Sequence, residues 1–137
     1  VTIDIDLQHP PELLDNFTLI PNETILLGYR NDRRNMPLTR QLSNFITSLL
    51  ISIRTCAVIK DSQCGYRSFQ TKIFNKIQCI EEGFQFESEF LIKAALAGWK
   101  VQHVPIPTIY GNESSAMRNV KDTIKFINMW LKSYFWT

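Results

Sequence analysis

The sequence lacks the features that mark several protein classes. Its three cysteines are odd in number and form no Cys-x-x-Cys motif, so neither a disulfide framework nor a zinc site is indicated. No apolar run reaches the about 18 residues that cross a bilayer. The net charge of +2 is too small to indicate a nucleic-acid-binding protein. The sparse cysteines favour a reducing, cytoplasmic setting.

The features that are present describe an ordinary globular domain. The chain has 137 residues, of which 45% are hydrophobic and 20% charged, enough for one domain with a core spanning 1–137. Strand-like and helix-like patterns alternate along it. The sequence therefore predicts an α/β fold, whose ligands bind at the carboxyl ends of the strands.

The opening stretch carries the strongest chemical signal. Val1, Ile3 and Ile5 predict a short buried strand that ends before Pro10-Pro11. Residues two apart in an extended chain point to the same side, so Asp4 and Asp6 can direct both carboxylates at one point. Converging carboxylate oxygens hold Mg²⁺ or Mn²⁺ and leave positions open for substrate phosphates. For an isolated Asp-x-Asp, a surface turn is the alternative.

A second motif lies in the middle of the chain, where Asp61 is followed by Gly65-Tyr66-Arg67. Glycine permits a close backbone approach at that point. Asp61 is expected in a loop facing the same cleft, where it acts as a general base on an acceptor hydroxyl or orients an acceptor that is already anionic. In the alternative interpretation, Asp61 pairs with Arg67 and fixes the loop.

Hydrophobic periodicity predicts the scaffold around these motifs. Strands are expected at 24–27 and at 99–110, where two prolines indicate an edge strand. A long helix is expected at 38–54, and a second helix should end at Gly98. The long helix has an apolar stripe that predicts burial, formed by Leu42, Phe45, Ile46, Leu49, Leu50 and Ile53.

The C-terminal residues, about 120–136, predict an amphipathic helix. Its apolar stripe is formed by Val120, Ile124, Ile127, Leu131 and Phe135, and lysines follow the other side. We expect the stripe to pack on the domain. A helix of this kind that is flanked by lysines and rich in aromatic residues can instead lie on a membrane surface.

The two motifs together resemble the inverting family-two glycosyltransferases of the GT-A fold. The nearest branch is the polyprenyl- or dolichyl-phosphate sugar transferases, with their Asp-Ala-Asp-x-Gln-His-x-Pro-Glu segment. The first motif matches that segment in register at Asp4, Asp6, Gln8, His9, Pro11 and Glu12. Asp61, Gly65, Tyr66 and Arg67 match a later motif of the same family, and Gly28-Tyr29-Arg30 is similar to its Gly-Ser-Arg step.

The resemblance implies a function and a set of roles. The chain would be the acceptor-side half of a catalytic domain, and without the nucleotide-binding half we expect this piece alone to be inactive. The reaction would transfer a sugar from a nucleotide-diphosphate donor, with inversion, to an acceptor such as polyprenyl phosphate. The implied metal ligands are Asp4, Asp6 and Gln8, the implied phosphate-binding residues are Arg30, Arg67, Ser114 and Arg118, and the implied catalytic residue is Asp61.

Some features leave alternatives open. Ser115 stands where the family has a lysine, which leaves the identity of the acceptor undecided. The arginines at 30, 33, 34 and 40 could form a phosphate-binding rim or a solvated loop. We also expect a peripheral contact with the inner face of the membrane. Self-association of two copies through an exposed sheet edge is a further expectation. The alternative function is a non-catalytic α/β interaction or scaffold module.

Overall fold

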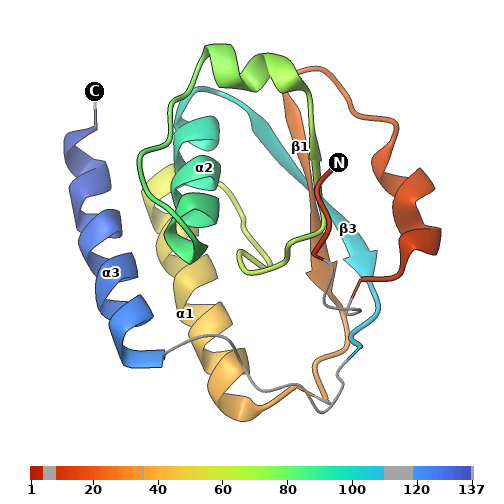
Figure 1. Ribbon diagram of the computed structural model, residues 1–137, viewed down its shortest axis with the longest axis horizontal. Coiled ribbons are helices and arrows are strands. Elements are labelled where there is room, and N and C mark those ends of the chain that lie inside the picture. Colours follow the sequence, from red (N-terminus) through yellow and green to blue (C-terminus); the bar gives the residue numbers. More distant parts are fainter. Residues whose placement is uncertain (5–8, 35, 110–118, 137) are drawn as a thin grey trace.

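The structure is a computed structural model that describes residues 1–4, 9–34, 36–109 and 119–136 (Figure 1). Within these ranges, three strands and three α-helices give a mixed α/β fold, which confirms the predicted class. The α-helices are α1 (Leu38–Thr55), α2 (Phe84–Leu96) and α3 (Asn119–Lys132). None of the helices within the described ranges combines the length and apolarity that crossing a membrane requires.

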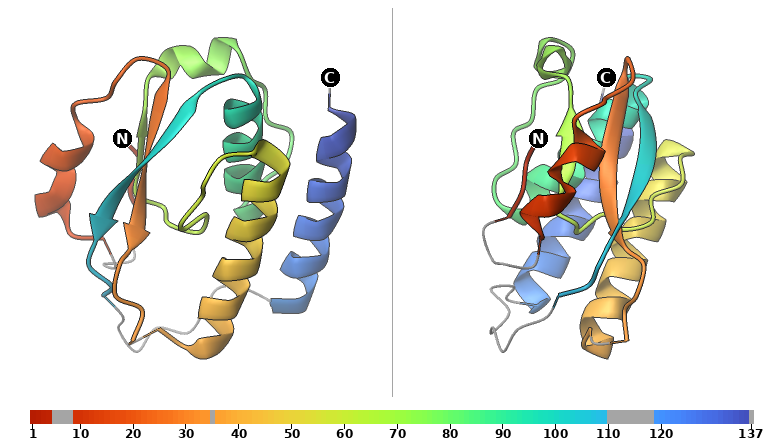
Figure 2. Two further views of the ribbon diagram at one scale, coloured as in Figure 1. Left: turned by 180° about the vertical axis from the view of Figure 1, so that it is seen from behind. Right: turned by 90° about the vertical axis from the view of Figure 1, so that its right-hand side faces the viewer.

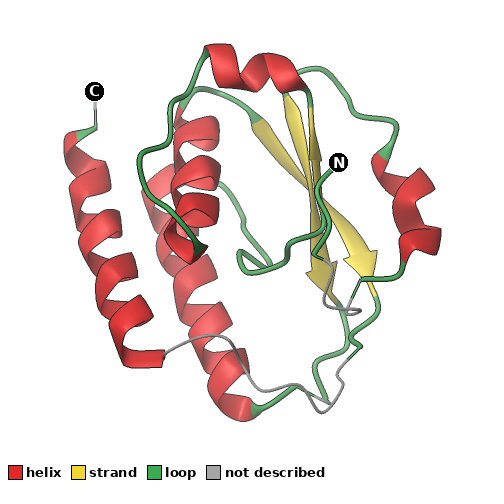
Figure 3. Cartoon of the chain, in the orientation of Figure 1, coloured by secondary structure: helices red, strands yellow, loops and turns green. Residues whose placement is uncertain are grey.

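The sheet has the order β2-β1-β3 (Figure 3). The central strand β1 (Thr24–Arg30) pairs antiparallel with β2 (Arg67–Phe69) and parallel with β3 (Lys100–Ile106). The sheet therefore brings the carboxyl end of β1 to the same edge as the carboxyl end of β3. The prediction of an edge strand near residue 100 is confirmed, since β3 pairs only with β1 among the described strands.

The opening segment lies along the free side of β2. Thr2 forms an isolated antiparallel bridge to Arg67, with backbone N–O distances of 2.7 and 3.0 Å. Val1 and Ile3 are 53% and 37% exposed. The prediction of a buried strand here was wrong for these two residues, because the segment lies at the edge of the sheet, where among the described residues it pairs only with Arg67.

Alternate residues of β1 point into two hydrophobic clusters. Ile25 and Leu27 pack with apolar residues of all three α-helices. Leu26 packs on the other face with Phe17, Tyr66 and Ile106. Phe17 belongs to the short 3₁₀ helix η1 (Pro11–Phe17), so the sheet is covered on both faces (Figure 2).

The orientation of α1 corrects the sequence prediction. The outer stripe contains Leu42, Phe45, Ile46, Leu49 and Ile53, which are between 45% and 60% exposed. The buried residues of the helix are Asn44, Ser48 and Ile51. The predicted burial was therefore wrong for these five residues, whereas Leu50, the sixth member of the predicted stripe, packs against the core. The inner face of α1 covers the polar loop before β2, whose buried groups need hydrogen-bond partners.

The predicted apolar stripe of the C-terminal helix also faces outward. Ile124, Ile127 and Leu131 of α3 are between 42% and 54% exposed, and Phe135 in η3 (Ser133–Phe135) is 85% exposed. Phe126 and Met129 form the buried side instead. The predicted packing of this stripe on the domain was therefore wrong for the residues whose side chains the structure describes.

A short 3₁₀ helix, η2 (Thr71–Asn75), follows β2. Gly98, which follows α2, has a φ of +89°, as predicted for a glycine just after a helix.

Candidate functional site

Asp61 and Arg30 form a buried two-point ion pair at the carboxyl end of β1. The Arg30 Nε and Nη2 atoms lie 2.8 and 2.9 Å from the two carboxylate oxygens of Asp61. Asn44 of α1 donates a third hydrogen bond to this carboxylate, at 2.8 Å. The Asp61 side chain is fully buried and that of Arg30 is 12% exposed. Burial acts to raise the pKa of Asp61, but the hydrogen bonds and charge of Arg30 outweigh it and lower that pKa below its usual value.

A chain of hydroxyl groups ties the loop that carries Asp61 to α1. Ser48 donates to the Asn44 side chain at 3.1 Å and lies 3.0 Å from the Ser62 hydroxyl. The Ser62 backbone N–H donates to the Ser48 hydroxyl at 2.9 Å. The polar inner face of α1 therefore sets where the Asp61 loop lies.

Arg67 holds the other end of this loop. Its buried guanidinium donates to the carbonyls of Ser62 and Cys64, at 2.9 and 2.8 Å, and to the Glu87 carboxylate of α2 at 2.7 Å. The alternative in which Arg67 pairs with Asp61 was wrong, because Arg67 pairs with Glu87 and Asp61 with Arg30. The role of Arg67 in binding phosphate stays a prediction.

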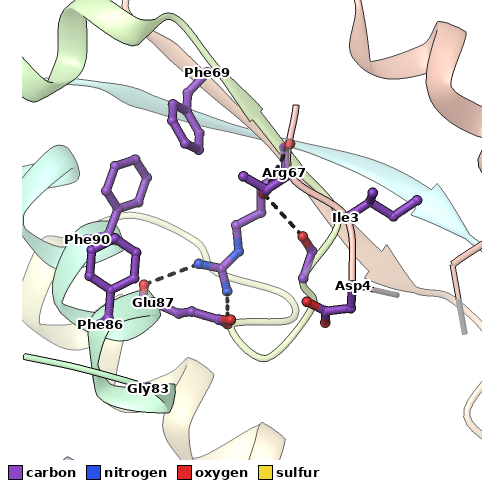
Figure 4. Close-up of a pocket in the computed structure, with 10 residues that line it drawn as sticks. Ile3, Asp4, Arg67, Phe69, Gly83, Phe86, Glu87 and Phe90 are labelled. Carbon is purple, nitrogen blue, oxygen red and sulfur yellow. Dashed lines mark hydrogen bonds and ion pairs between the residues drawn. The ribbon is translucent and has the colours of Figure 1, made fainter. Parts of the chain in front are cut away.

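A hollow of about 160 Å³ opens beside Arg67 (Figure 4). Asp4 lies on one side of it and Glu87 on another, and aromatic rings from β2 and α2 complete its apolar wall. The Asp4 carboxylate occupies the space that a Cβ atom on Gly65 would fill. Only glycine at position 65 therefore allows this seating of Asp4.

Glu87 shares the hollow with Asp4 and is 33% exposed. Burial raises the pKa of Glu87, Arg67 acts to lower it, and the charge of Asp4 raises it further. The net direction is upward. The negative charge of Asp4 thus acts on Glu87 across the hollow, and the buried guanidinium of Arg67 opposes its effect.

The metal site is only partly described. Among the residues that the structure describes, no group of three or more His, Cys, Asp or Glu side chains could hold a metal ion. Asp6, Gln8, Ser114 and Arg118 lie outside the described residues. Asp4 is exposed and offers a hard oxygen ligand, which suits Mg²⁺ or Mn²⁺. The chemistry of the predicted set therefore fits either ion, and its geometry can be followed at Asp4 alone.

The predicted basic rim divides into residues with different surroundings. Arg33 donates to the Lys60 carbonyl at 2.9 Å. Arg34 pairs at the surface with Asp32, at 2.7 Å. The Lys60 ammonium lies 4.4 Å from the centre of the Tyr29 ring. Arg30 differs from these surface cations because its charge is held at the end of β1 by Asp61.

His9, which belongs to the first motif, contacts Cys64 of the second motif. The Cys64 sulfur lies 3.7 Å from the Nε2 atom of His9, and both residues are buried. Burial, with the nearby charge of Asp61, raises the pKa of the Cys64 thiol to about 12. The thiol is therefore protonated at neutral pH and is no nucleophile.

Sequence reasoning missed two residues of this region. Glu87 resembles an ordinary acidic residue in the first turn of a helix, where it suits the helix dipole. Asn44 lies on the polar side of a helix whose apolar side was expected to be buried. Its position four residues after Arg40 was the available signal, because residues four apart share a helix face.

Comparison with known proteins finds relatives among curated sequences. No family model and no solved structure matches the chain. It is 31% identical over 119 residues to an uncharacterized protein of Methanocaldococcus jannaschii, covering 80% of this chain and 49% of the relative. It is 28% identical over 111 residues to a dolichyl-phosphate hexose transferase of Haloferax volcanii, covering 78% and 48%.

A further relative is the UDP-N-acetylglucosamine--dolichyl-phosphate N-acetylglucosaminyltransferase of Methanococcus voltae. It is 29% identical over 125 residues, covering 85% of this chain and 50% of the relative. The chain thus spans about half the length of these relatives. Two of them are named as dolichyl-phosphate glycosyltransferases, which supports a glycosyltransferase family for this chain.

Proposed function

We propose that the chain forms the acceptor-side half of a GT-A glycosyltransferase domain. The reaction is the transfer of a sugar, with inversion, from a nucleotide-diphosphate donor to a polyprenyl phosphate. The names of two relatives support this acceptor class. The proposal depends most on one observation: the two motifs, far apart in the sequence, meet where Asp4 is seated over Gly65.

The metal is proposed to be held by Asp4, Asp6 and Gln8. When bound, Mg²⁺ or Mn²⁺ would neutralise the charge that grows on the departing nucleotide diphosphate. Asp4 contributes an exposed carboxylate, whose oxygens lie in the space that the absent side chain of Gly65 leaves open. Glu87 lies across the same hollow and keeps Arg67 in place behind it.

Arg30 is the proposed source of fixed positive charge, together with Arg118, and Ser114 is proposed to bind phosphate through its neutral hydroxyl. A guanidinium that is already oriented costs no reorganisation when charge develops in the transition state. Arg30 donates two hydrogen bonds to the Asp61 carboxylate, and the Asp61 side chain is fully buried. We therefore propose that Asp61 acts on the acceptor through Arg30, as a positioning residue, instead of taking a proton from the acceptor directly.

The competing candidate is a non-catalytic scaffold module. The observation in its favour is that Arg30 and Asp61 neutralise each other in a buried pair, as structural ion pairs do. On this view the exposed Asp4 would bind no metal. The two candidates differ in a binding measurement that needs no turnover.

Isothermal titration calorimetry of a complete enzyme that contains these 137 residues, with Mn²⁺ and UDP- or GDP-sugar, tests the proposal. We expect metal-dependent binding that is lost in Asp4→Asn and kept in Asp15→Asn, which changes an exposed carboxylate in η1. Equal binding by the wild type and Asp4→Asn would overturn the metal role. Absence of binding in the wild type would favour the scaffold.

A further inference from the structure

The two residues that precede Arg30 and Asp61 in the chain also contact each other. Tyr29 comes directly before Arg30 at the end of β1, and Lys60 comes directly before Asp61 in the loop. The Lys60 ammonium lies 4.4 Å from the centre of the Tyr29 ring, a distance at which an aromatic face attracts a cation. The strand end and the loop are therefore joined twice, once by the buried ion pair and once by this cation–π contact.

His103 of the neighbouring strand β3 binds the backbone of this loop. The strands β1 and β3 lie side by side, and His103 is opposite Leu27 in their register (Figure 1). It therefore lies on the same face of the sheet as Tyr29, and the two rings meet edge to face with 6.1 Å between their centres. The Lys60 backbone N–H donates a hydrogen bond of 3.2 Å to the Nε2 atom of His103. His103 thus holds the loop one residue before Asp61.

This hydrogen bond requires a neutral imidazole. A backbone N–H can only donate, so the Nε2 atom of His103 accepts with its lone pair and the proton of the neutral ring is on Nδ1. A protonated ring has N–H donors at both nitrogens and would set one donor against another. Histidine is the side chain that changes between these two forms near physiological pH. The contact with Lys60 therefore exists in one protonation state of His103 and not in the other.

The surroundings of His103 favour its neutral form at neutral pH. Partial burial lowers the pKa of His103 below its usual 6.5, and the positive charge of Lys60 lowers it further. Arg33 approaches from the segment after β1 and donates to the Lys60 carbonyl at 2.9 Å. The titratable and charged groups that face the ring or the residue it binds are Tyr29, Lys60, Arg33 and the paired Arg30 and Asp61. Their net charge is positive, which opposes protonation of the ring.

We propose that His103 is a positioning residue that holds the Asp61 loop while it is neutral and releases the loop when it is protonated. This proposal rests on the proposed function, in which Asp61 keeps Arg30 in place for the reaction. Protonation of His103 removes the acceptor of the Lys60 N–H and adds a positive charge that repels the Lys60 ammonium. Sugar transfer should therefore become slower in acid, although His103 acts only through the loop.

The pH profile of sugar transfer by a complete enzyme that contains these 137 residues tests the proposal. His103→Gln keeps an acceptor for the Lys60 N–H but cannot gain a proton, whereas His103→Leu removes the acceptor at every pH. Between about pH 7.5 and about pH 5, wild-type kcat should fall about tenfold more than that of His103→Gln, the effect of losing one ordinary hydrogen bond. The ratio of the two profiles cancels the titration of the acceptor phosphate and of the carboxylates. His103→Leu should be slow throughout this range.

Nitrogen NMR of the imidazole rings provides a readout that needs no turnover. The His103 signal, identified by its absence from the His103→Gln spectrum, should show the proton on Nδ1 at neutral pH and should titrate below the usual 6.5. Lys60→Gln keeps the backbone N–H and removes the ammonium, so it should move this titration to higher pH. Lys72→Gln is the matched control, because Lys72 is also exposed but contacts Asn22, near the start of β1. It should leave the titration unchanged.

Three results would overturn the proposal: the same pH profile for the wild type and His103→Gln, a wild-type rate in His103→Leu, or a neutral ring whose proton is on Nε2. Failure here is separable from failure of the proposed function. Identical profiles in an enzyme that transfers sugar would remove the role of His103 and leave the transferase standing. If no sugar is transferred, the proposed function fails, and the ring tautomer and the Lys60→Gln shift still decide whether neutral His103 holds the loop.

Discussion

Arg30 and Asp61 meet in a two-point ion pair, with Nε–Oδ2 and Nη2–Oδ1 distances of 2.8 and 2.9 Å. The pair links the end of the central strand to the loop before β2. Asn44 of α1 completes it with a hydrogen bond of 2.8 Å. Three separate elements are therefore held together at one fully buried carboxylate.

Breaking this pair should destabilise the fold. Asp61→Asn leaves the Arg30 charge without its counter-charge, and we expect a loss of about 3–5 kcal/mol in the free energy of unfolding. Urea denaturation measures this loss. The double variant Arg30→Met/Asp61→Leu should recover most of it, because no buried charge then remains.

The surface pair of Arg34 and Asp32 provides the control for that experiment. Its members lie 2.7 Å apart and are 88% and 46% exposed. Arg34→Ala should leave the urea midpoint almost unchanged, since exposed ion pairs add little stability. If Asp61→Asn unfolds at the same urea concentration as the wild type, the buried pair does not stabilise the fold.

The same carboxylate should make stability depend on acid pH. Folding lowers the pKa of Asp61 below its usual 3.8. The pair's contribution is therefore complete above about pH 4 and declines as the pH falls through the lowered value. We expect the stability difference between the wild type and Asp61→Asn to narrow below about pH 4. A constant difference throughout the acid range would contradict this linkage.

Gly65→Ala should displace the Asp4 carboxylate while leaving the fold intact. A Cβ at position 65 would overlap the carboxylate, which is the free end of a side chain and can move aside. We expect Mn²⁺ affinity, measured by calorimetry, to fall with little change in the urea midpoint.

Gly98→Ala is the matched control for that change. Its φ is +89° and no atom lies within 4 Å of the added Cβ. It should cost about 1–2 kcal/mol of backbone strain, without any effect on Mn²⁺ affinity. A Gly65→Ala protein with wild-type affinity would separate Asp4 from metal binding.

Asp4→Asn should lower the pKa of Glu87. That pKa is raised by burial and, further, by the negative charge of Asp4, against the opposing effect of Arg67. Removing the Asp4 charge leaves burial and Arg67, so the titration of Glu87 should shift to lower pH. Carboxyl-carbon NMR of the side chain measures it, and an unchanged titration would mean that the two carboxylates do not share the hollow.

The local patterns of the sequence predicted much of the scaffold. The apolar run at 24–27 became part of β1, and the period of the long helix gave α1 within one residue of its end. Periodicity did not predict which side of α1 faces inward. It locates a stripe, but Asn44 and Ser48 are buried because the Asp61 loop needs hydrogen-bond partners, a tertiary requirement.

The sequence also did not predict which charged residues pair with each other. The spacing of Asp61 and Arg67 suggested a local pair, whereas Asp61 reaches Arg30 and Arg67 reaches Glu87. Both real partners come from elements distant in the chain, brought near by the sheet and by α2. The motif predicted a close approach to the backbone at Gly65, and the structure shows that the Asp4 carboxylate makes it.

Sugar transfer itself is the most direct measurement. In a complete enzyme that contains these 137 residues, transfer of labelled sugar from UDP- or GDP-sugar to dolichyl phosphate with Mn²⁺ should fall by about 10²–10³ in Asp4→Ala and in Asp6→Ala. Asp15→Ala, in η1, should transfer at the wild-type rate. Asp4 and Asp6 variants that keep most of the rate would contradict the metal-assisted transferase.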